Sequence, residues 1–250
     1  MKKKEERLKK IVVNEQLCLL TAKYLGIEIT ESFIVTTDGD DENVLFATKR
    51  YDRKFMKDDK MLNGMPVPRR LHQEDFAQAL GIAAANKYEK NNEGYLKKLF
   101  DVIRSHSADP MTDSLKLWDI CIFNYLIGNT DNHIKNLSLL YSEGLKIVRL
   151  APAYDIVSTI IYKSSTENMA LSIDGICNIN DITRASFEAT DDETGCDTIE
   201  TITQNVIDDT FAVNVRGSIL MTREFIKHRG DYGRIINIST DASKIFSNAR

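Results

Sequence analysis

The chain has 250 residues, of which 42% are hydrophobic and 28% are charged, with 12 glycines and 4 prolines. This composition is typical of a globular protein and excludes collagen-like, low-complexity and wholly disordered chains. The 33 basic and 37 acidic residues give a formal net charge of −4, so a uniformly basic surface that binds nucleic acid directly is not expected.

The sequence shows no targeting segment and no paired cysteines. It contains no run of about eighteen apolar residues, and its first residues are charged, so we predict neither a membrane span nor a secretory signal and expect a cytoplasmic protein. The four cysteines lie far apart without a CxxC pair. This spacing favours free thiols over a zinc or redox site.

The first third of the chain is predicted to hold one helix and one hairpin. Apolar residues at helical spacing predict a helix over Asn14–Leu25, which Gly26 ends. Ile27–Val35 and Val44–Tyr51 are rich in β-branched and aromatic residues and flank a polar turn, so they predict a β-hairpin. From Gln73 onward the apolar residues follow helical periods. Strands followed by a helical block predict an α+β protein with a cleft between two lobes.

A second hairpin is predicted after Gly128, from the apolar runs 137–141 and 146–150. Because an antiparallel hairpin returns the chain to its starting end, Asp131 and Asn136 before it can meet Asp155 after it. Such oxygen ligands suit Mg²⁺, which completes its shell with phosphate oxygens and water. Protein kinases use this order of residues for a catalytic base and two metal ligands. In the alternative interpretation, Asp131 and Asn136 satisfy a turn and Asp155 caps a helix.

The residues on both sides of this hairpin resemble those of a known family. Residues 126–136 (LIGNTDNHIKN) and 152–156 (PAYDI) are similar to the catalytic core of HipA-like serine/threonine protein kinases, the toxin halves of bacterial toxin-antitoxin pairs. Further motifs occur in that family's order: Asn14-Glu15, 49–53 (KRYDR), 70–76 (RLHQEDF), 87–89 (KYE) and 169–173 (MALSI). The resemblance covers Asn14 to Ala189. It implies a protein-kinase-like α+β fold, with a truncated N-lobe over 1–68 and a helical catalytic C-lobe over 69–190.

The resemblance also implies roles for individual residues. Asp131 would be the catalytic base, and Asn136 and Asp155 would hold Mg²⁺. Lys135 would reach the phosphoryl group transferred from ATP, while His133 would orient the catalytic loop or serve packing alone.

The nucleotide would lie against a second group of residues. Lys49, Arg50 and Tyr51 would form the hinge between the lobes, whose backbone meets adenine, and Glu15 belongs to the same nucleotide-binding set. Asp52 would hydrogen-bond ribose or would instead form a salt bridge with a neighbouring arginine. The implied activity is transfer of the ATP γ-phosphoryl group to a serine or threonine of another protein, with a helix-turn-helix antitoxin as a partner.

One feature departs from the family pattern at the N-terminus. A glycine-containing phosphate loop and a lysine-bearing strand precede the first helix of the family, whereas the residues before Asn14 contain neither. Because such a clamp stabilises transition-state charge, we expect phosphotransfer to be impaired. A catalytically silent toxin-antitoxin binding module is the alternative.

A second departure follows Ala189, where 190–195 is acidic and linker-like. The rest of the segment 191–250 resembles the middle of a short-chain dehydrogenase/reductase, which implies an α/β Rossmann-type fragment with a buried strand over 234–239. Asn214 and Thr240 would match that family's site, but no Tyr-x-x-x-Lys pair or glycine-rich dinucleotide turn is present. An NAD(P)-dependent oxidoreductase is therefore the least favoured alternative.

Overall fold

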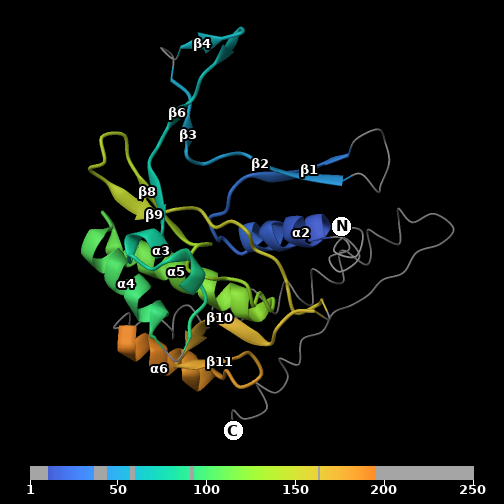
Figure 1. Cartoon of the computed structure of the whole chain (residues 1–250), viewed down its shortest axis with the longest axis vertical. Coiled ribbons are helices and arrows are strands. Elements are labelled where there is room, and N and C mark those ends of the chain that lie inside the picture. Colours follow the sequence, from blue (N-terminus) through green and yellow to red (C-terminus); the bar gives the residue numbers. More distant parts are fainter. Residues whose placement is uncertain (1–10, 37–43, 57–59, 91–92, 163, 195–250) are drawn as a thin grey trace, which may run out of the picture.

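The computed structural model describes residues 11–36, 44–56, 60–90, 93–162 and 164–194, and it confirms the predicted N-terminal helix and hairpin (Figure 1). Helix α2 (Ile11–Tyr24) begins slightly earlier than predicted. Strands β1 (Ser32–Thr36) and β2 (Val44–Thr48) pair antiparallel with Ser32 opposite Thr48. α2 contacts both strands, so the first helix and the first hairpin form one packed unit.

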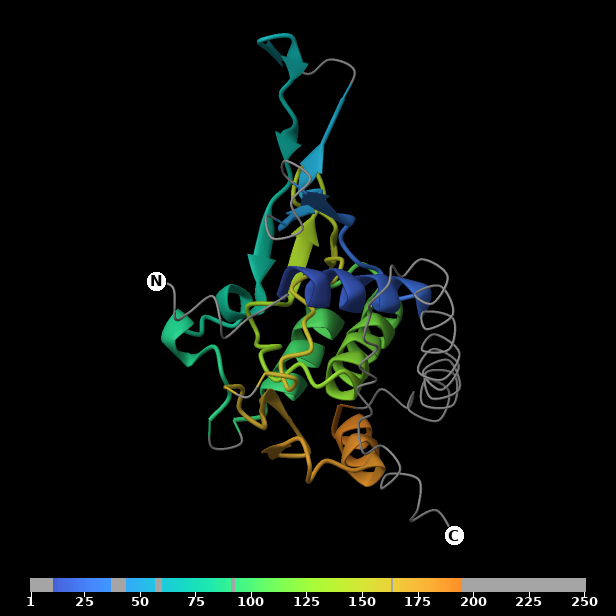
Figure 2. The same ribbon diagram turned by 90° about the vertical axis from the view of Figure 1, so that its right-hand side faces the viewer.

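A narrow antiparallel arm follows β2. It is made of two pairs of two-residue strands, β3 (Arg53–Lys54) with β6 (Arg69–Arg70) and β4 (Met61–Leu62) with β5 (Met65–Pro66). Figures 1 and 2 show this arm projecting away from the helices. The sequence pattern did not predict it, because strands this short carry no recognisable alternation.

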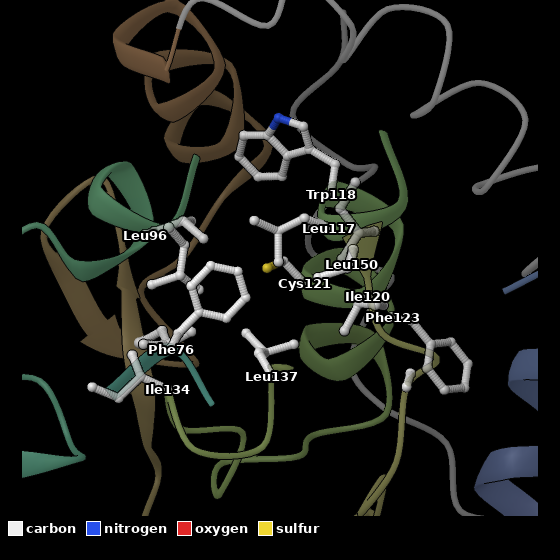
Figure 3. Close-up of a cluster of buried hydrophobic side chains, with 14 of the residues drawn as sticks. Phe76, Leu96, Leu117, Trp118, Ile120, Cys121, Phe123, Ile134, Leu137 and Leu150 are labelled. Carbon is white, nitrogen blue, oxygen red and sulfur yellow. The ribbon is translucent and has the colours of Figure 1, made fainter. Parts of the chain in front are cut away.

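The predicted helical block is confirmed and holds the hydrophobic core. Helices α4 (Tyr95–His106) and α5 (Pro110–Leu126) pack on each other, and the rings of Phe100 and Trp118 have centroids 5.1 Å apart. Figure 3 shows further core side chains, including the fully buried Ile134, gathered around α5. Because Ile134 belongs to the loop that carries Asp131, the core anchors that loop directly.

A three-stranded sheet joins the arm to the helical block. Strands β7 (Gln73–Asp75), β8 (Ser138–Tyr141) and β9 (Val148–Leu150) lie in that order, and Leu139 is opposite both Glu74 and Leu150. The β8–β9 hairpin was predicted, but the pairing of β7 was not. β7 leads into α3 (Phe76–Ala79), where Asp75 and Gln78 form a capping box.

A short 3₁₀ turn, η2 (Ala84–Asn86), lies between α3 and α4. After β9 come the antiparallel pair β10 (Asn168–Ile173) and β11 (Ile176–Asn178) and then helix α6 (Arg184–Thr194). α6 corrects the sequence-based assignment of 190–194 to a linker. Phe187 on this helix packs against the rings of Trp118 and Tyr125, so tertiary contact fixes a helix in an acidic segment.

The dehydrogenase-like fragment and the rest of the expected linker lie outside the described residues, as do the strand over 234–239, Asn214 and Thr240. Among the helices that are described, none is both long and apolar enough to cross a bilayer.

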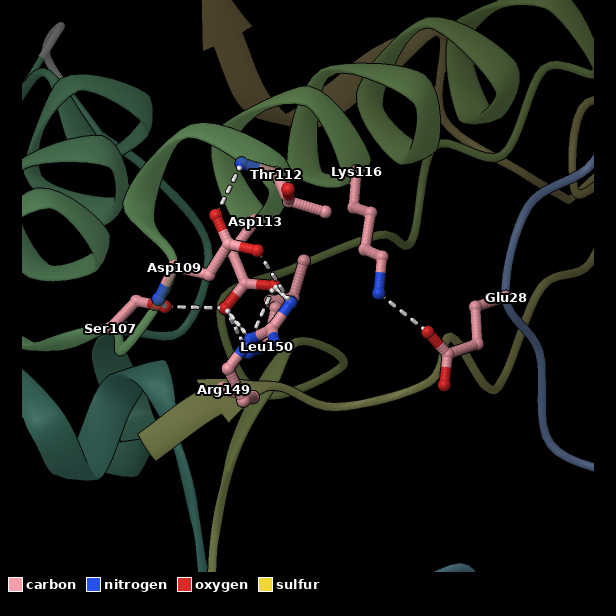
Figure 4. Close-up of polar contacts among 8 residues, drawn as sticks. All are labelled: Glu28, Ser107, Asp109, Thr112, Asp113, Lys116, Arg149 and Leu150. Atoms are coloured by element: carbon pink, nitrogen blue, oxygen red, sulfur yellow. Dashed lines mark hydrogen bonds and ion pairs between the residues drawn. The ribbon is translucent and has the colours of Figure 1, made fainter. Parts of the chain in front are cut away.

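A buried carboxylate fixes the start of α5 against β9 (Figure 4). Asp113 is fully buried and accepts hydrogen bonds from Ser107 Oγ at 2.6 Å, Arg149 Nε at 3.0 Å and the Leu150 amide at 2.9 Å. Burial alone would raise the pKa of Asp113, but these hydrogen bonds outweigh burial and hold its pKa below the usual value.

Replacing Asp113 should therefore destabilise the folded protein at neutral pH. We expect Asp113→Asn to lower the free energy of unfolding by about 3 kcal/mol, because a buried, hydrogen-bonded charge pair is broken. Since the folded-state pKa is depressed, the stabilisation is present above the unfolded value of 3.8 and is lost as the pH falls through the folded value. Urea unfolding between pH 7 and pH 3 measures this difference.

The matched control is Asp101→Asn, which removes an exposed i,i+4 pair with Lys97 on α4. It should change the free energy of unfolding by less than about 0.5 kcal/mol. Equal losses for the two variants would contradict the assignment of Asp113 as the anchor.

Candidate active site

The loop that carries Asp131 begins where α5 ends. Gly128 adopts a left-handed conformation, with φ of +66°, and its carbonyl oxygen accepts hydrogen bonds from the Thr159 and Ile160 amides. Asn129 donates from its side chain to Asn124 Oδ1 at 2.6 Å and accepts from the Asp131 amide at 3.2 Å. The backbone before Asp131 is thus held both by the 159–160 segment and by the Asn129 side chain.

The segment that carries Asp155 is held by a different part of the chain. Ile29 forms a parallel bridge with Ala153, and the Ala153 amide donates to the Glu28 carbonyl oxygen at 2.8 Å. This bridge corrects the predicted start of the first strand, because residues 28–30 pair with the Ala153 segment instead of extending the β1–β2 hairpin. Asp155 itself has a φ of +56°, an unfavourable conformation for a non-glycine residue that tends to occur at functional sites.

The hairpin brings the three acid and amide side chains of the loop together. Asn136 Nδ2 donates to the Asp131 carbonyl oxygen at 3.1 Å, and the Asn136 side chain lies near enough to the Asp155 carboxylate to counteract the rise in its pKa. The Tyr154 hydroxyl, which hydrogen-bonds Ser138 Oγ at 2.6 Å, donates to the Lys135 carbonyl oxygen at 3.0 Å. Partial removal from water and the nearby charge of Asp131 raise the pKa of Asp155.

Glu15 on α2 lies in the same electrostatic neighbourhood. Burial and the charge of Asp155 raise the pKa of Glu15 to about 7. Asn14, the preceding residue, binds the adjoining segment, since its Nδ2 donates to the Ser158 carbonyl oxygen at 2.9 Å. The first helix therefore places a third carboxyl group near Asp155, and the role of Glu15 in nucleotide binding stays a prediction.

The segment 87–89 supplies two side chains to the site that sequence reasoning missed. Lys87 Nζ lies 2.7 Å from His133 Nε2, and the Tyr88 hydroxyl donates to Asp131 Oδ1 at 2.6 Å. Burial and the charge of Lys87 lower the pKa of His133, which keeps the imidazole neutral at physiological pH. The sequence identified the KYE motif only by resemblance. No spacing rule links it to a loop more than forty residues later.

Two predicted site residues are engaged elsewhere. Lys135 Nζ forms an ion pair with Asp75 Oδ2 at 2.6 Å, so its ammonium group is directed to the cap of α3. Asp52 is 1% exposed and pairs with Arg50 and Arg53. Of the two interpretations of Asp52, the geometry favours the salt bridge over a ribose contact.

The remaining residues of the predicted hinge follow β2. Lys49 pairs at the surface with Glu31 at 3.2 Å, and its amide donates to the Glu31 carbonyl oxygen. The Tyr51 ring stacks on Tyr154, with centroids 6.1 Å apart. Tyr51 thus connects the hinge to the residue before Asp155.

The donor set fits a divalent cation that brings further ligands with it. Asp131, Asn136 and Asp155 offer carboxylate and amide oxygens, the ligands that Mg²⁺ prefers, and a cation would relieve the repulsion between the two carboxylates. In the part of the chain that the structure describes, no group of three or more His, Cys, Asp or Glu side chains could hold a metal ion. Two carboxylates and one amide do not enclose a metal ion by themselves. They therefore suit Mg²⁺, whose remaining ligands would be phosphate oxygens and water.

The fold is mixed α/β, and the comparisons with known proteins specify its family. Residues 1–214 match the model of the HipA-like C-terminal domain. The chain belongs to this family. The match extends past Ala189, where the motifs ended, and includes Asn214, so it gives no support to a separate dehydrogenase-like unit beginning at 196.

Individual relatives agree with the family match. The "Putative kinase Y4mE" of Sinorhizobium fredii is 36% identical over 160 residues, which cover 64% of this chain and 35% of that protein. The serine/threonine-protein kinase toxin HipA of Shewanella oneidensis is 27% identical over 191 residues, which cover 72% of this chain and 41% of that protein. The chain thus spans less than half the length of these two relatives.

A solved structure shows the same fold. It is HipA from the Shewanella oneidensis MR-1 toxin-antitoxin system, in complex with HipB and operator DNA. It superposes with a TM-score of 0.68 and 22% identity over 96% of this chain and 53% of that chain.

The geometry at Gly128 predicts a large effect of adding one methyl group. A Cβ at this position would lie 2.4 Å from Ile160 Cγ2. We expect Gly128→Ala to cost about 3 kcal/mol in unfolding free energy, from this overlap and from the left-handed backbone. Gly144→Ala, where φ is +89° and no atom lies within 4 Å, should cost about 1 kcal/mol in the same urea titration. Equal costs would contradict close packing of the loop on Ile160.

The raised pKa of Glu15 predicts a pH-dependent penalty. Its folded-state value of about 7 exceeds the ordinary value of 4.5, so ionisation destabilises the fold increasingly as the pH rises from 4.5 to 7. Allowing for solvent screening, we expect Glu15→Gln to be more stable than the parent by about 1–2 kcal/mol at pH 8 and equal to it near pH 4.5. Urea unfolding with a chelator present measures this, with the exposed Glu188→Gln as the control. A constant difference across this range would contradict the raised pKa of Glu15.

Proposed function

We propose that this chain is the catalytic domain of a HipA-like protein serine/threonine kinase of a toxin-antitoxin pair. The observation that supports this most is the convergence of Asp131, Asn136 and Asp155 around one hairpin, in a chain of the HipA-like family. ATP is the proposed phosphoryl donor, and Asn136 and Asp155 are the residues that would hold Mg²⁺. When bound, the ion would neutralise charge on the phosphates.

The chain's own residues would carry the proton transfer. Asp131 accepts the proton of the serine or threonine hydroxyl as the hydroxyl oxygen bonds to the γ-phosphorus, and ADP leaves with the electrons of the broken bond. The neutral His133, held by Lys87, orients the loop next to Asp131. Lys135 fixes the loop through Asp75, so its role is positioning unless it leaves that ion pair.

The proposed partners follow from the relatives. The similar HipA structure is a complex with HipB and operator DNA, which supports an antitoxin protein as a partner of this chain. The net charge of −4 argues that any association with DNA would go through that partner.

A catalytically silent binding module is the second candidate. It is favoured by the engagement of Asp131 with Tyr88 and of Lys135 with Asp75, because both groups are then occupied within the chain. Titration with Mg²⁺ and ATP discriminates between the two. Micromolar affinity that is lost in Asp155→Asn supports the kinase, while antitoxin binding without nucleotide binding supports the module.

Asp131→Asn should slow transfer strongly without unfolding the chain. Asp131 is exposed, so its replacement should change stability little, while loss of a general base lowers the rate about 10²–10⁴-fold. Transfer of labelled γ-phosphate from ATP to a mixed pool of serine and threonine peptides measures this, with Asp101→Asn as the control. Retention of the parent rate in Asp131→Asn would overturn the proposed role.

A further inference from the structure

The Tyr88 hydroxyl is bound to the carboxylate proposed as the catalytic base. Its Oη donates to Asp131 Oδ1 over 2.6 Å, the length of a strong hydrogen bond to a charged acceptor. In phosphoryl transfer by kinases, the acceptor hydroxyl makes its hydrogen bond to this same carboxylate. Tyr88 Oη therefore occupies the position that an acceptor hydroxyl needs.

The residues on both sides of Tyr88 are held in place, Glu89 through its amide and carboxylate and Lys87 through its side chain. Glu89 is buried, and its carboxylate accepts hydrogen bonds from the Gly94 and Ser172 amides, both at 2.7 Å. Its own amide donates to the Ala170 carbonyl oxygen at 2.9 Å. On the other side, Lys87 is tied to His133 Nε2. The tyrosine is thus presented to Asp131 by a fixed segment and does not arrive there through a loose loop.

The Tyr88 side chain is far less confined than its backbone. It is 40% exposed, its ring meets the edge of His133 with centroids 5.2 Å apart, and Lys87 Nζ lies 4.8 Å from the ring centre. A rotation about the Cα–Cβ bond can therefore release the hydroxyl toward solvent without any movement of Glu89. The hydrogen bond from Tyr88 to Asp131 can therefore be replaced by one from another donor.

We propose that Tyr88 determines acceptor specificity by holding the acceptor position at Asp131 until a protein hydroxyl replaces its own. The inference rests on the proposed kinase function and adds an acceptor subsite formed by Tyr88, Lys87 and His133. A polypeptide acceptor can offset the lost hydrogen bond with contacts to the displaced ring and the neighbouring lysine, whereas a water molecule cannot. The subsite therefore favours protein segments over water and limits unproductive ATP hydrolysis.

The test is Tyr88→Phe, which keeps the ring and removes the hydroxyl. With Mg²⁺ and ATP, we expect the KM for the serine and threonine peptide pool to fall about fivefold with kcat within twofold, and ATP hydrolysis without peptide to rise about fivefold. The matched control is Tyr141→Phe, which removes a tyrosine-carboxylate hydrogen bond to Glu74 at 2.5 Å on β8. It should leave all three quantities unchanged.

Two results would overturn the inference while leaving the kinase proposal intact. One is a parent that transfers phosphate and a Tyr88→Phe variant with unchanged KM and hydrolysis. The other is a Tyr88→Phe variant whose kcat falls tenfold at constant KM, because Tyr88 would then only orient Asp131.

An NMR measurement that does not depend on catalysis tests whether Tyr88 and Asp131 are hydrogen-bonded in solution. The ¹³Cζ resonance of Tyr88, assigned as the one missing in Tyr88→Phe, should shift in Asp131→Asn if the hydrogen bond exists in solution. An unshifted resonance overturns the inference whatever the activity. A shifted resonance together with no transfer by the parent and by Tyr88→Phe refutes the kinase proposal, and the acceptor subsite with it.

Discussion

The site depends on holding two carboxylates, Asp131 and Asp155, near each other against their mutual repulsion. Burial and the charge of Asp131 raise the pKa of Asp155, and burial and the charge of Asp155 in turn raise the pKa of Glu15. Hydrogen bonds oppose this repulsion, because the main chain at Ala153 is paired with Glu28 and Ile29 and the Tyr154 hydroxyl donates to the Lys135 carbonyl oxygen. Negative charge concentrated in this way supports the proposal that the site takes a divalent cation.

Positive charge approaches this acidic centre from outside the loop. Lys87 reaches His133 from a segment anchored by the buried Glu89, and it lowers the pKa of His133 while also counteracting the raised pKa of Asp155. Lys135, although it lies within the loop, is used to hold the loop on the cap of α3. Lys135, which the sequence analysis directed to the phosphoryl group, thus holds the loop, whereas Lys87 from outside the loop brings its positive charge to the acidic centre.

Local patterns were sufficient for elements whose partners are close in sequence. The first helix, the β1–β2 hairpin, the β8–β9 hairpin and the α4–α5 block follow from apolar spacing and turn residues. Pairing of β7 with β8, and of Ile29 with Ala153, joins segments that no periodicity connects. α6 forms in an acidic stretch because Phe187 finds Trp118 and Tyr125, a contact made only after folding.

The sequence by itself determined the order of Asp131, Asn136 and Asp155 and the hairpin that joins them, because chain reversal follows from local turn chemistry. Tertiary structure alone decided that Tyr88, from the segment after α3, meets that centre, whereas the family resemblance had already assigned Glu15 to the nucleotide-binding set. Tertiary structure also decided that Asp52 is neutralised by arginines. The reason is physical, since side-chain partners are selected by packing between distant segments, and a one-dimensional pattern carries no distance between them.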